Sequence, residues 1–250
     1  MQLLARFLSA LKKTETTYGI SSSSKNAIMV MPIICLFLAF LFLSIRATRS
    51  PMLWMLKENC PIELCTFLAL LGGGLYGLVF TYRLKQRAEA LWVIGFYMLF
   101  SLSLIFVGME EISWGQSFFR FKTPELVESI NVQRELTLHN LQGLQGHSEV
   151  FRLIFGLGGL IGVMASCIPG TEKIGAPAIL LPCFFVIITH AAVDFYDDIL
   201  PIGLRFNLLM QRTSEVVELL IGVAGLLYVV LNARMLGAIA PFPAAYAANR

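Results

Sequence analysis

Residues 89–111 have the sequence EALWVIGFYMLFSLSLIFVGMEE, in which 20 uncharged residues lie between Glu89 and Glu110. A helix needs roughly 20 mostly apolar residues to cross the hydrocarbon core of a bilayer. The stretch therefore predicts a membrane-spanning helix that ends on two adjacent carboxylates, Glu110 and Glu111. The whole 250-residue chain agrees, because 57% of its residues are hydrophobic and only 14% are charged, a composition typical of membrane proteins.

Apolar runs of this kind recur along the chain and predict an all-α, polytopic bundle of about six transmembrane helices. The transmembrane domain is expected over 27–236, with spans at about 27–45, 61–80, 89–109, 150–168, 176–196 and 215–235. Before it, residues 1–26 comprise a basic, amphipathic segment that should lie on the membrane surface and a serine linker at 21–24. After it, residues 237–250 are expected to form a flexible tail.

Charge limits the partners of this chain. The net charge is only +3, and the basic residues stand in twos and threes beside apolar runs. No continuous basic stripe is present to follow a phosphate backbone, which excludes nucleic acid as a partner and leaves membrane lipids. The basic residues of the N-terminal segment and of 83–87 would lie on one side of the membrane, so the positive-inside rule places both termini in the cytoplasm. This orientation is opposed by the basic residues between the first and second spans, which would then lie outside: Arg46, Arg49 and Lys57.

Six spans also fix which polar residues share a face of the membrane. The end of the third span, the 110–149 loop, the end of the fifth span and the start of the sixth must all lie on one side. That side receives Glu110, Glu111, Glu125, Glu128, Glu135, His139, His147, Glu149, His190, Asp194, Asp197, Asp198, Glu215 and Glu218. We call this side of the bundle the mouth face.

Several of these residues are spaced so that they share a helix face. His190 and Asp194 are four apart, Glu215 and Glu218 are three apart, and Glu135 and His139 are four apart if 132–141 is helical. Imidazole and carboxylate groups from several helices are typical of zinc or iron sites and of general acid–base catalysis. We expect Glu111, Glu135, His139, His190 and Asp194 as metal ligands and Glu110 or Glu218 as the general base.

The connection between the third and fourth spans is about forty residues long, which is unusual for a loop without a function. Thr123-Pro124-Glu125 is a typical helix start, with a capping threonine and a proline in the first turn. We therefore expect short interfacial helices in the 110–149 loop, forming a lid over the mouth. Trp114, Phe118, Phe119 and Phe121 suit anchoring at the membrane interface.

One segment resembles a known family. Glu110 through Gln116 (EEISWGQ), Asn131-Val132-Gln133, and Glu135 through Leu141 with its Leu-His-Asn-Leu ending are similar to a signature of uncharacterised bacterial multi-pass inner-membrane proteins. About thirty residues carry the resemblance. It implies a bacterial inner-membrane location and a shared site built from Glu110, Glu111, Trp114, Gln116, Glu135, His139 and Asn140, in which Trp114, Gln116 and Asn140 support the acidic and histidine residues.

Three functions are compatible with this pattern. The first is a metal-dependent enzyme that acts on a lipid or lipid-linked substrate, with the metal activating water or polarising an ester or phosphoester oxygen. The second is a non-catalytic scaffold or assembly subunit whose polar face docks a protein partner. The third is a cation- or proton-coupled transporter, since ionisable residues near a membrane cavity serve such carriers too.

Overall fold

The computed structural model describes residues 2–57, 59–132, 134–138, 141 and 148–237, and this part of the chain is helical without β-strands. It includes six helices long and apolar enough to cross a membrane. The predicted all-α architecture is therefore confirmed, and the six candidate spans are consistent with a multi-pass membrane protein. The spans are α2 (Ser22–Ser44), α4 (Pro61–Gln86), α5 (Leu91–Glu111), α8 (Ser148–Ala165), α9 (Leu181–Ile199, preceded by the 3-10 turn η2, Ala178–Leu180) and α10 (Leu204–Met235).

The structure differs from the expected elements at the start of α2, in the segment that follows α2 and at the start of α10. The serine run at 21–24 starts α2 instead of forming a linker, because the Ser21 hydroxyl caps the helix by accepting the backbone N–H of Ser24 at 3.1 Å. The short helix α3 (Arg46–Met55) follows α2 on the mouth side. Helix α10 begins at Leu204, eleven residues before the expected 215, so its first turns precede the apolar run.

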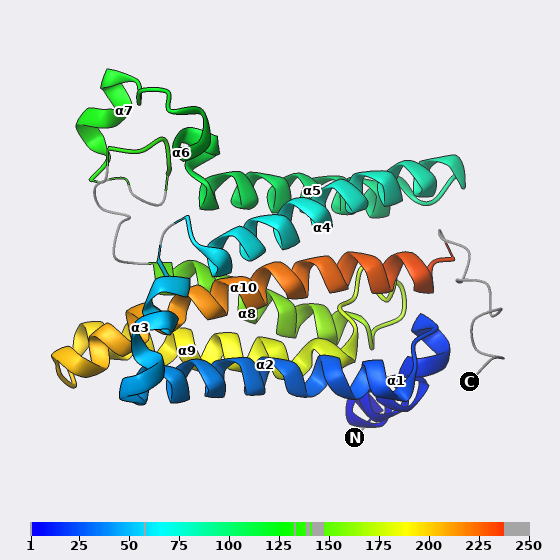
Figure 1. Ribbon diagram of the computed structural model, residues 1–250. Helices are drawn as coiled ribbons and strands as arrows, with labels where there is room; N and C mark the ends of the chain where they lie inside the picture. The colour runs from blue at the N-terminus through cyan, green and yellow to red at the C-terminus, as the bar shows by residue number, and fades with distance from the viewer. Residues whose placement is uncertain (1, 58, 133, 139–140, 142–147, 238–250) are drawn as a thin grey trace, which may run out of the picture.

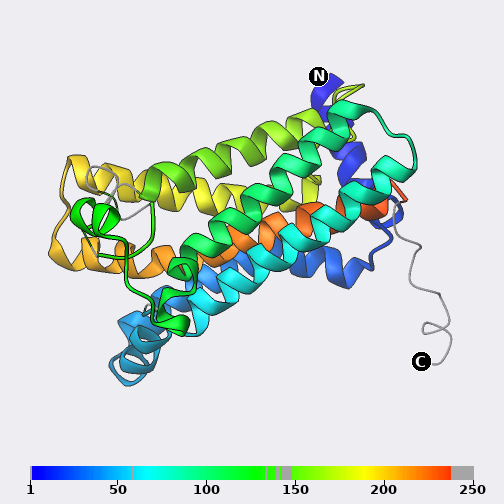
Figure 2. The ribbon, with the colours of Figure 1, turned by 90° about the horizontal axis from the view of Figure 1, so that it is seen from above.

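Helix α10 is the most buried of the six spans and lies at the centre of the bundle (Figure 2). It contacts α4, α9, α2, α8 and the N-terminal helix α1 (Gln2–Tyr18). Small residues permit these close approaches. A Cβ atom on Gly73 would lie 3.1 Å from the Leu226 Cα atom, and one on Gly225 would lie 2.8 Å from the Leu104 side chain. The backbones of α4 and α10 therefore approach each other closely at Gly73, and Leu104 of α5 packs on the backbone of α10 at Gly225.

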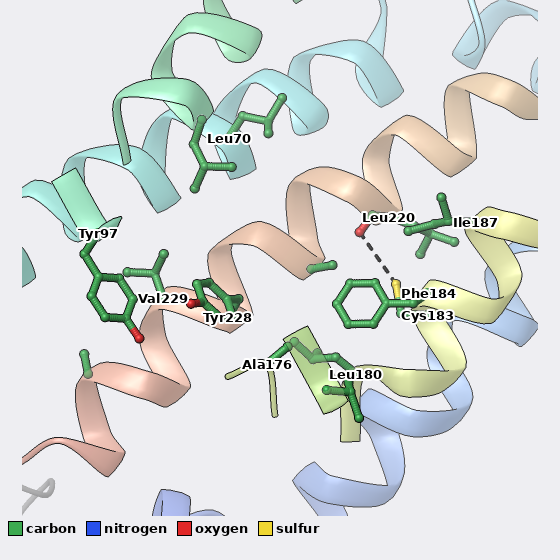
Figure 3. Close-up of a cluster of buried hydrophobic side chains, with 14 of the residues drawn as sticks. Leu70, Tyr97, Ala176, Leu180, Cys183, Phe184, Ile187, Leu220, Tyr228 and Val229 are labelled. Carbon is green, nitrogen blue, oxygen red and sulfur yellow. Dashed lines mark hydrogen bonds between the residues drawn. The ribbon is translucent and has the colours of Figure 1, made fainter. Parts of the chain in front are cut away.

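A second close pair is formed by α8 and α9. Cβ atoms added to Gly156 and Gly159 would lie 2.5 Å from Ile188 and 2.3 Å from the Phe184 ring. Figure 3 shows the buried cluster where this pair meets α10, with Phe184, Ile187 and Leu220 packed together and the Cys183 thiol donating to the carbonyl of Leu220 at 3.7 Å. These glycines are therefore packing residues, as expected for small residues in membrane helices.

At the end of the bundle opposite the mouth face, polar side chains of α5 and α10 form hydrogen bonds with the loop that precedes α9. The hydroxyl groups of Tyr97 and Tyr228 donate to the carbonyls of Lys173 and Ile174 at 2.7 and 2.6 Å, and the Asn232 amide donates to Gly175 at 3.0 Å. Lys173 also pairs with Glu89 at 2.6 Å, and its hydrogen bond holds the pKa of that carboxyl below the ordinary value. The loop before α9 is thus tied to the core.

The glycine triplet of α4 provides a test of this packing. A Cβ atom on Gly74 would lie 2.7 Å from the Ser101 carbonyl oxygen, a backbone atom that cannot move aside, whereas one on Gly72 would meet nothing within 4 Å. Gly74→Ala should lower the free energy of unfolding by about 1–3 kcal/mol, and Gly72→Ala should change it by less than about 0.5 kcal/mol. Unfolding of the purified variants in mixed detergent micelles measures both. Equal stability of the two variants would contradict the close α4–α5 contact.

Candidate functional site

The mouth face is assembled from the ends of α5 and α9 and the starts of α4, α8 and α10, which lie at one end of the bundle (Figure 1). Helix α1 and the end of α10 lie at the other end. Three groups of polar residues occupy the mouth side: a cluster of carboxylates, a hydrogen-bonded loop and a buried set around an ion pair.

The first group is an acid cluster, defined here as Glu63, Glu110, Glu111, Glu215 and Glu218. Glu111, the last residue of α5, lies within electrostatic range of Glu218, Glu215, Glu63 and Glu110. The carboxylates come from α4, α5 and α10, so three helices bring them together. Like charges gathered in this way repel one another unless protons or a cation neutralise them. The cluster is therefore the candidate place for a proton or a cation on the mouth face.

Glu63 is a member of this cluster that the sequence pattern did not reveal. It lies in the first turn of α4, two residues after Pro61, and its carboxylate accepts the backbone N–H of Asn59. An acidic residue in a first turn is normally explained by the positive end of the helix dipole. The alternation of the spans could have identified it. Successive spans cross in opposite directions, so the start of the second span lies on the same side of the membrane as Glu111 at the end of the third.

The second group is the loop network, built on Glu110, Ser113, Trp114, Gln116 and Glu135. Glu110 accepts hydrogen bonds from the Trp114 indole at 2.7 Å and from the Leu138 backbone N–H at 2.6 Å. Glu135 accepts the Ser113 hydroxyl at 2.7 Å. Ser113 and Trp114 have positive φ angles of 48° and 56°, a costly conformation for residues with side chains. The two carboxylates hold this strained turn in place.

Gln116 and Thr123 extend the network to the short helices α6 (Gln116–Phe119) and α7 (Glu125–Ile130). The Gln116 amide donates to the Thr123 hydroxyl at 2.8 Å, and its carbonyl accepts the Leu136 N–H at 3.0 Å. Thr123 donates to the Arg134 carbonyl at 2.6 Å. The prediction that Thr123 caps α7 is therefore wrong: Pro124 occupies the cap position without a side-chain bond, since the threonine hydroxyl is already used.

The expected helix over 132–141 is also not observed in the described residues of this range. Asn131 and Leu141 instead form an isolated antiparallel bridge, and the Asn131 amide donates to the Thr137 carbonyl at 2.8 Å. The i, i+4 argument that paired Glu135 with His139 therefore fails for Glu135. His139, Asn140 and His147 lie outside the described residues.

The third group is the buried polar set, defined as Arg152, His190, Asp194 and Thr213. Arg152 of α8 forms an ion pair with Asp194 of α9, with 2.6 Å between Nη2 and Oδ2, and both residues are buried. His190, one turn before Asp194, lies 2.9 Å from the Thr213 hydroxyl of α10 through its Nε2 atom. Helices α8, α9 and α10 thus meet around charged and polar side chains.

Arg152 is a member of this set that the sequence pattern did not indicate, although a charged residue near the start of an apolar span is itself a signal. An arginine in this position is costly unless a partner neutralises it. The pairing gives Asp194 a structural role that the expected metal site did not include. The other acid of this region, Asp197, accepts the Ile202 N–H at 2.7 Å and the Asn207 amide at 3.2 Å, which stabilises the turn between α9 and α10.

The expected metal ligands are therefore divided between groups. Glu111 belongs to the acid cluster, Glu135 to the loop network, and His190 and Asp194 to the buried polar set. Within the described ranges, no three His, Cys, Asp or Glu side chains lie close enough to share a metal ion. The oxygen atoms of the acid cluster are donors that suit hard cations such as Mg²⁺ better than zinc.

Comparison with known proteins adds no further assignment: no family model, no curated protein and no solved structure matches the chain.

The role of Glu110 in the loop network gives a direct prediction. Glu110→Ala removes the acceptor of the Leu138 N–H and of the Trp114 indole. If the free energy of local opening falls by about 1.4 kcal/mol, a protected amide exchanges about tenfold faster. Hydrogen exchange of the 134–138 segment should therefore become about tenfold faster. Glu125→Ala, at an exposed position in α7, is the control and should leave exchange unchanged. Equal exchange rates in both variants would show that Glu110 does not hold the loop.

Proposed function

We propose that this chain is a membrane-embedded enzyme of the bacterial inner membrane that acts on a lipid or lipid-linked substrate at the mouth face. The observation that supports it is the acid cluster, in which Glu111 stands among four other carboxylates from α4, α5 and α10. A purely structural bundle gains nothing from placing like charges together at a membrane boundary. Clusters of this kind are typical of sites that move protons or hold a cation.

The geometry favours Glu218 over Glu110 as the general base. Both oxygens of Glu110 accept hydrogen bonds from the loop, from Trp114 and Leu138, which gives this carboxylate a role in positioning the loop. Glu218, on α10, lies within electrostatic range of Glu111. A pair of neighbouring carboxylates can share one proton, so that one acts as the acid while the other acts as the base. In this proposal Glu111 and Glu218 form the acid–base pair and Glu110 positions the loop.

A divalent metal is the second component of the proposal. No three carboxylates of the described residues lie close enough to share a metal ion, so at most two of the acid cluster would hold the cation together with oxygens of the substrate. The cation would polarise an ester or phosphoester oxygen of the substrate. Metal analysis of the purified protein by mass spectrometry separates the two forms of the mechanism. A stoichiometric metal that is lost in Glu111→Gln supports metal-assisted chemistry, and a metal-free active protein supports proton transfer alone.

The activity itself is tested with the full chain reconstituted in nanodiscs. The protein is incubated with a bacterial lipid extract, and consumed and formed lipids are identified by mass spectrometry. The wild type should convert at least one lipid species, and Glu218→Gln should lose this conversion. Wild-type protein that changes no lipid in such extracts, with or without added Mg²⁺, Mn²⁺ or Zn²⁺, would contradict the enzyme proposal.

A further inference from the structure

An apolar groove of about 620 Å³ runs between α2, α9 and the first turns of α10. Helices α2 and α9 lie side by side in Figure 1 and in direct contact. One end of the groove is lined by Leu181 and Pro182, and the mouth end by Val193, Phe206 and Met210. The groove does not include any member of the acid cluster.

The residues around the groove indicate that it opens toward lipid and not toward water. Its rim residues Ile33 and Phe185 are 55% and 53% exposed, and both belong to spans that cross the membrane. Exposed apolar side chains at this position face hydrocarbon, so the groove opens toward lipid. From Leu181 to Val193 the helix rises about 18 Å at 1.5 Å per residue, close to the roughly 15 Å of hydrocarbon in one leaflet. The groove therefore has the length of one lipid chain.

One side chain interrupts the apolar lining with a buried polar atom. His190 lines the groove and is 4% exposed, and its Nδ1 atom has no hydrogen-bond partner among the described residues. The hydroxyl of Thr213 lies 2.9 Å from the Leu209 carbonyl, so its single proton is donated within α10. With that proton donated within the helix, the hydroxyl oxygen accepts the Nε2–H of His190 at 2.9 Å.

This arrangement fixes the chemistry of the remaining nitrogen. A neutral imidazole has one N–H group. In the tautomer that donates from Nε2 to Thr213, Nδ1 carries a lone pair. An unpaired acceptor buried in an apolar environment is costly. A ligand that donates a hydrogen bond at this point would remove that cost, whereas a purely hydrocarbon ligand would not.

We propose that the groove holds an alkyl chain of a membrane lipid, and that the Nδ1 atom of His190 accepts a hydrogen bond from a hydroxyl group of that lipid. The groove supplies the apolar contact and the length, and His190 supplies selection among lipids. As the binding site of a substrate, this inference rests on the proposed function. As a lipid site, it stands on the groove and His190 alone.

Photolabelling tests the groove in the full chain. The probe is a diacylglycerol with a diazirine on one acyl chain, added at trace level to phosphatidylethanolamine and phosphatidylglycerol vesicles. Labelling of peptides from α2 and α9 should exceed labelling of the lipid-facing Leu99 in α5, which is 68% exposed. Ile33→Trp fills the groove and should reduce labelling about tenfold. The neighbouring Ile34→Trp, also exposed but outside the groove lining, should leave it unchanged.

The role of His190 is tested with a second probe in which the hydroxyl is acetylated. Wild-type protein should be labelled about fivefold more by the free hydroxyl probe, the difference expected from one hydrogen bond. His190→Phe should label equally with both probes. Uniform labelling of all lipid-facing helices would overturn the lipid site, and so would equal labelling of the Ile33→Trp and Ile34→Trp variants. Equal labelling of the wild type by both probes would overturn the hydroxyl contact. None of these measurements requires turnover, so they separate this inference from the enzyme proposal.

Discussion

Arg152→Ala is expected to lower the free energy of unfolding by about 3–5 kcal/mol, the usual cost of leaving one member of a buried ion pair without its partner. The pair has 2.6 Å between nitrogen and oxygen, with side-chain exposures of 4% for Arg152 and 10% for Asp194. Asp194 would remain as a charge inside the span interface, where hydration cannot stabilise it. Equilibrium unfolding in mixed detergent micelles measures the loss.

Two further variants separate the ion pair from other effects of the substitution. Lys173→Ala removes a pair with the same 2.6 Å distance, but its side chains are 41% and 22% exposed, so the expected loss is only about 0–1 kcal/mol. The double variant Arg152→Met, Asp194→Leu replaces both charges with apolar groups of similar size and should recover most of the stability. A double variant as unstable as Arg152→Ala would show that the site requires charge for another reason.

Glu111→Gln should have opposite effects on activity and on stability. Removal of a general acid or base lowers the rate about 10²–10⁴-fold. The same change replaces a carboxyl group, which burial and the neighbouring Glu218 and Glu215 disfavour in its charged form, with a neutral amide. The free energy of unfolding should therefore rise by about 0.5–2 kcal/mol. Lipid conversion in nanodiscs and unfolding in micelles give the two values. This combination is the signature of an active site that is maintained at a cost in stability.

Glu172→Gln is the matched control for Glu111→Gln. Glu172 is an exposed carboxylate in the loop at the opposite end of the bundle, and its substitution should change neither quantity. If Glu111→Gln is less stable than the wild type while Glu172→Gln is not, the Glu111 carboxylate is a structural acceptor, and the acid cluster does not support the catalytic proposal.

The sequence predicted the spans well because the bilayer imposes one requirement, a sufficient run of apolar residues, on every crossing helix. Residues 61–80 and 89–109 became α4 and α5 with small shifts at their ends. The start of α10 was missed because its first eleven residues include Asn207, Gln211 and Arg212, which a hydropathy pattern treats as a loop. Tertiary contacts of the helix, such as that between Thr213 and His190, stabilise these turns instead.

The candidate site was predicted in part. The alternating direction of the spans placed Glu111 and Glu218 on one side of the membrane, and in the structure they lie within electrostatic range of each other. Spacing along one helix could not show which partner each residue would find on another. His190 and Asp194 share a face of α9 as expected, yet one meets Thr213 and the other meets Arg152. Cross-helix partners depend on packing, which a local sequence pattern does not contain.

The central position of α10 has a consequence for how the protein is made. Helices α4 and α5 form one hairpin and α8 and α9 another, while α10 contacts members of both. Of the six spans it is the last to leave the ribosome. Until it inserts, the surfaces that it covers, such as the one around Gly73 of α4, remain in contact with lipid. The membrane insertion machinery would therefore shelter an open, two-part intermediate whose halves are joined when the final helix slides between them.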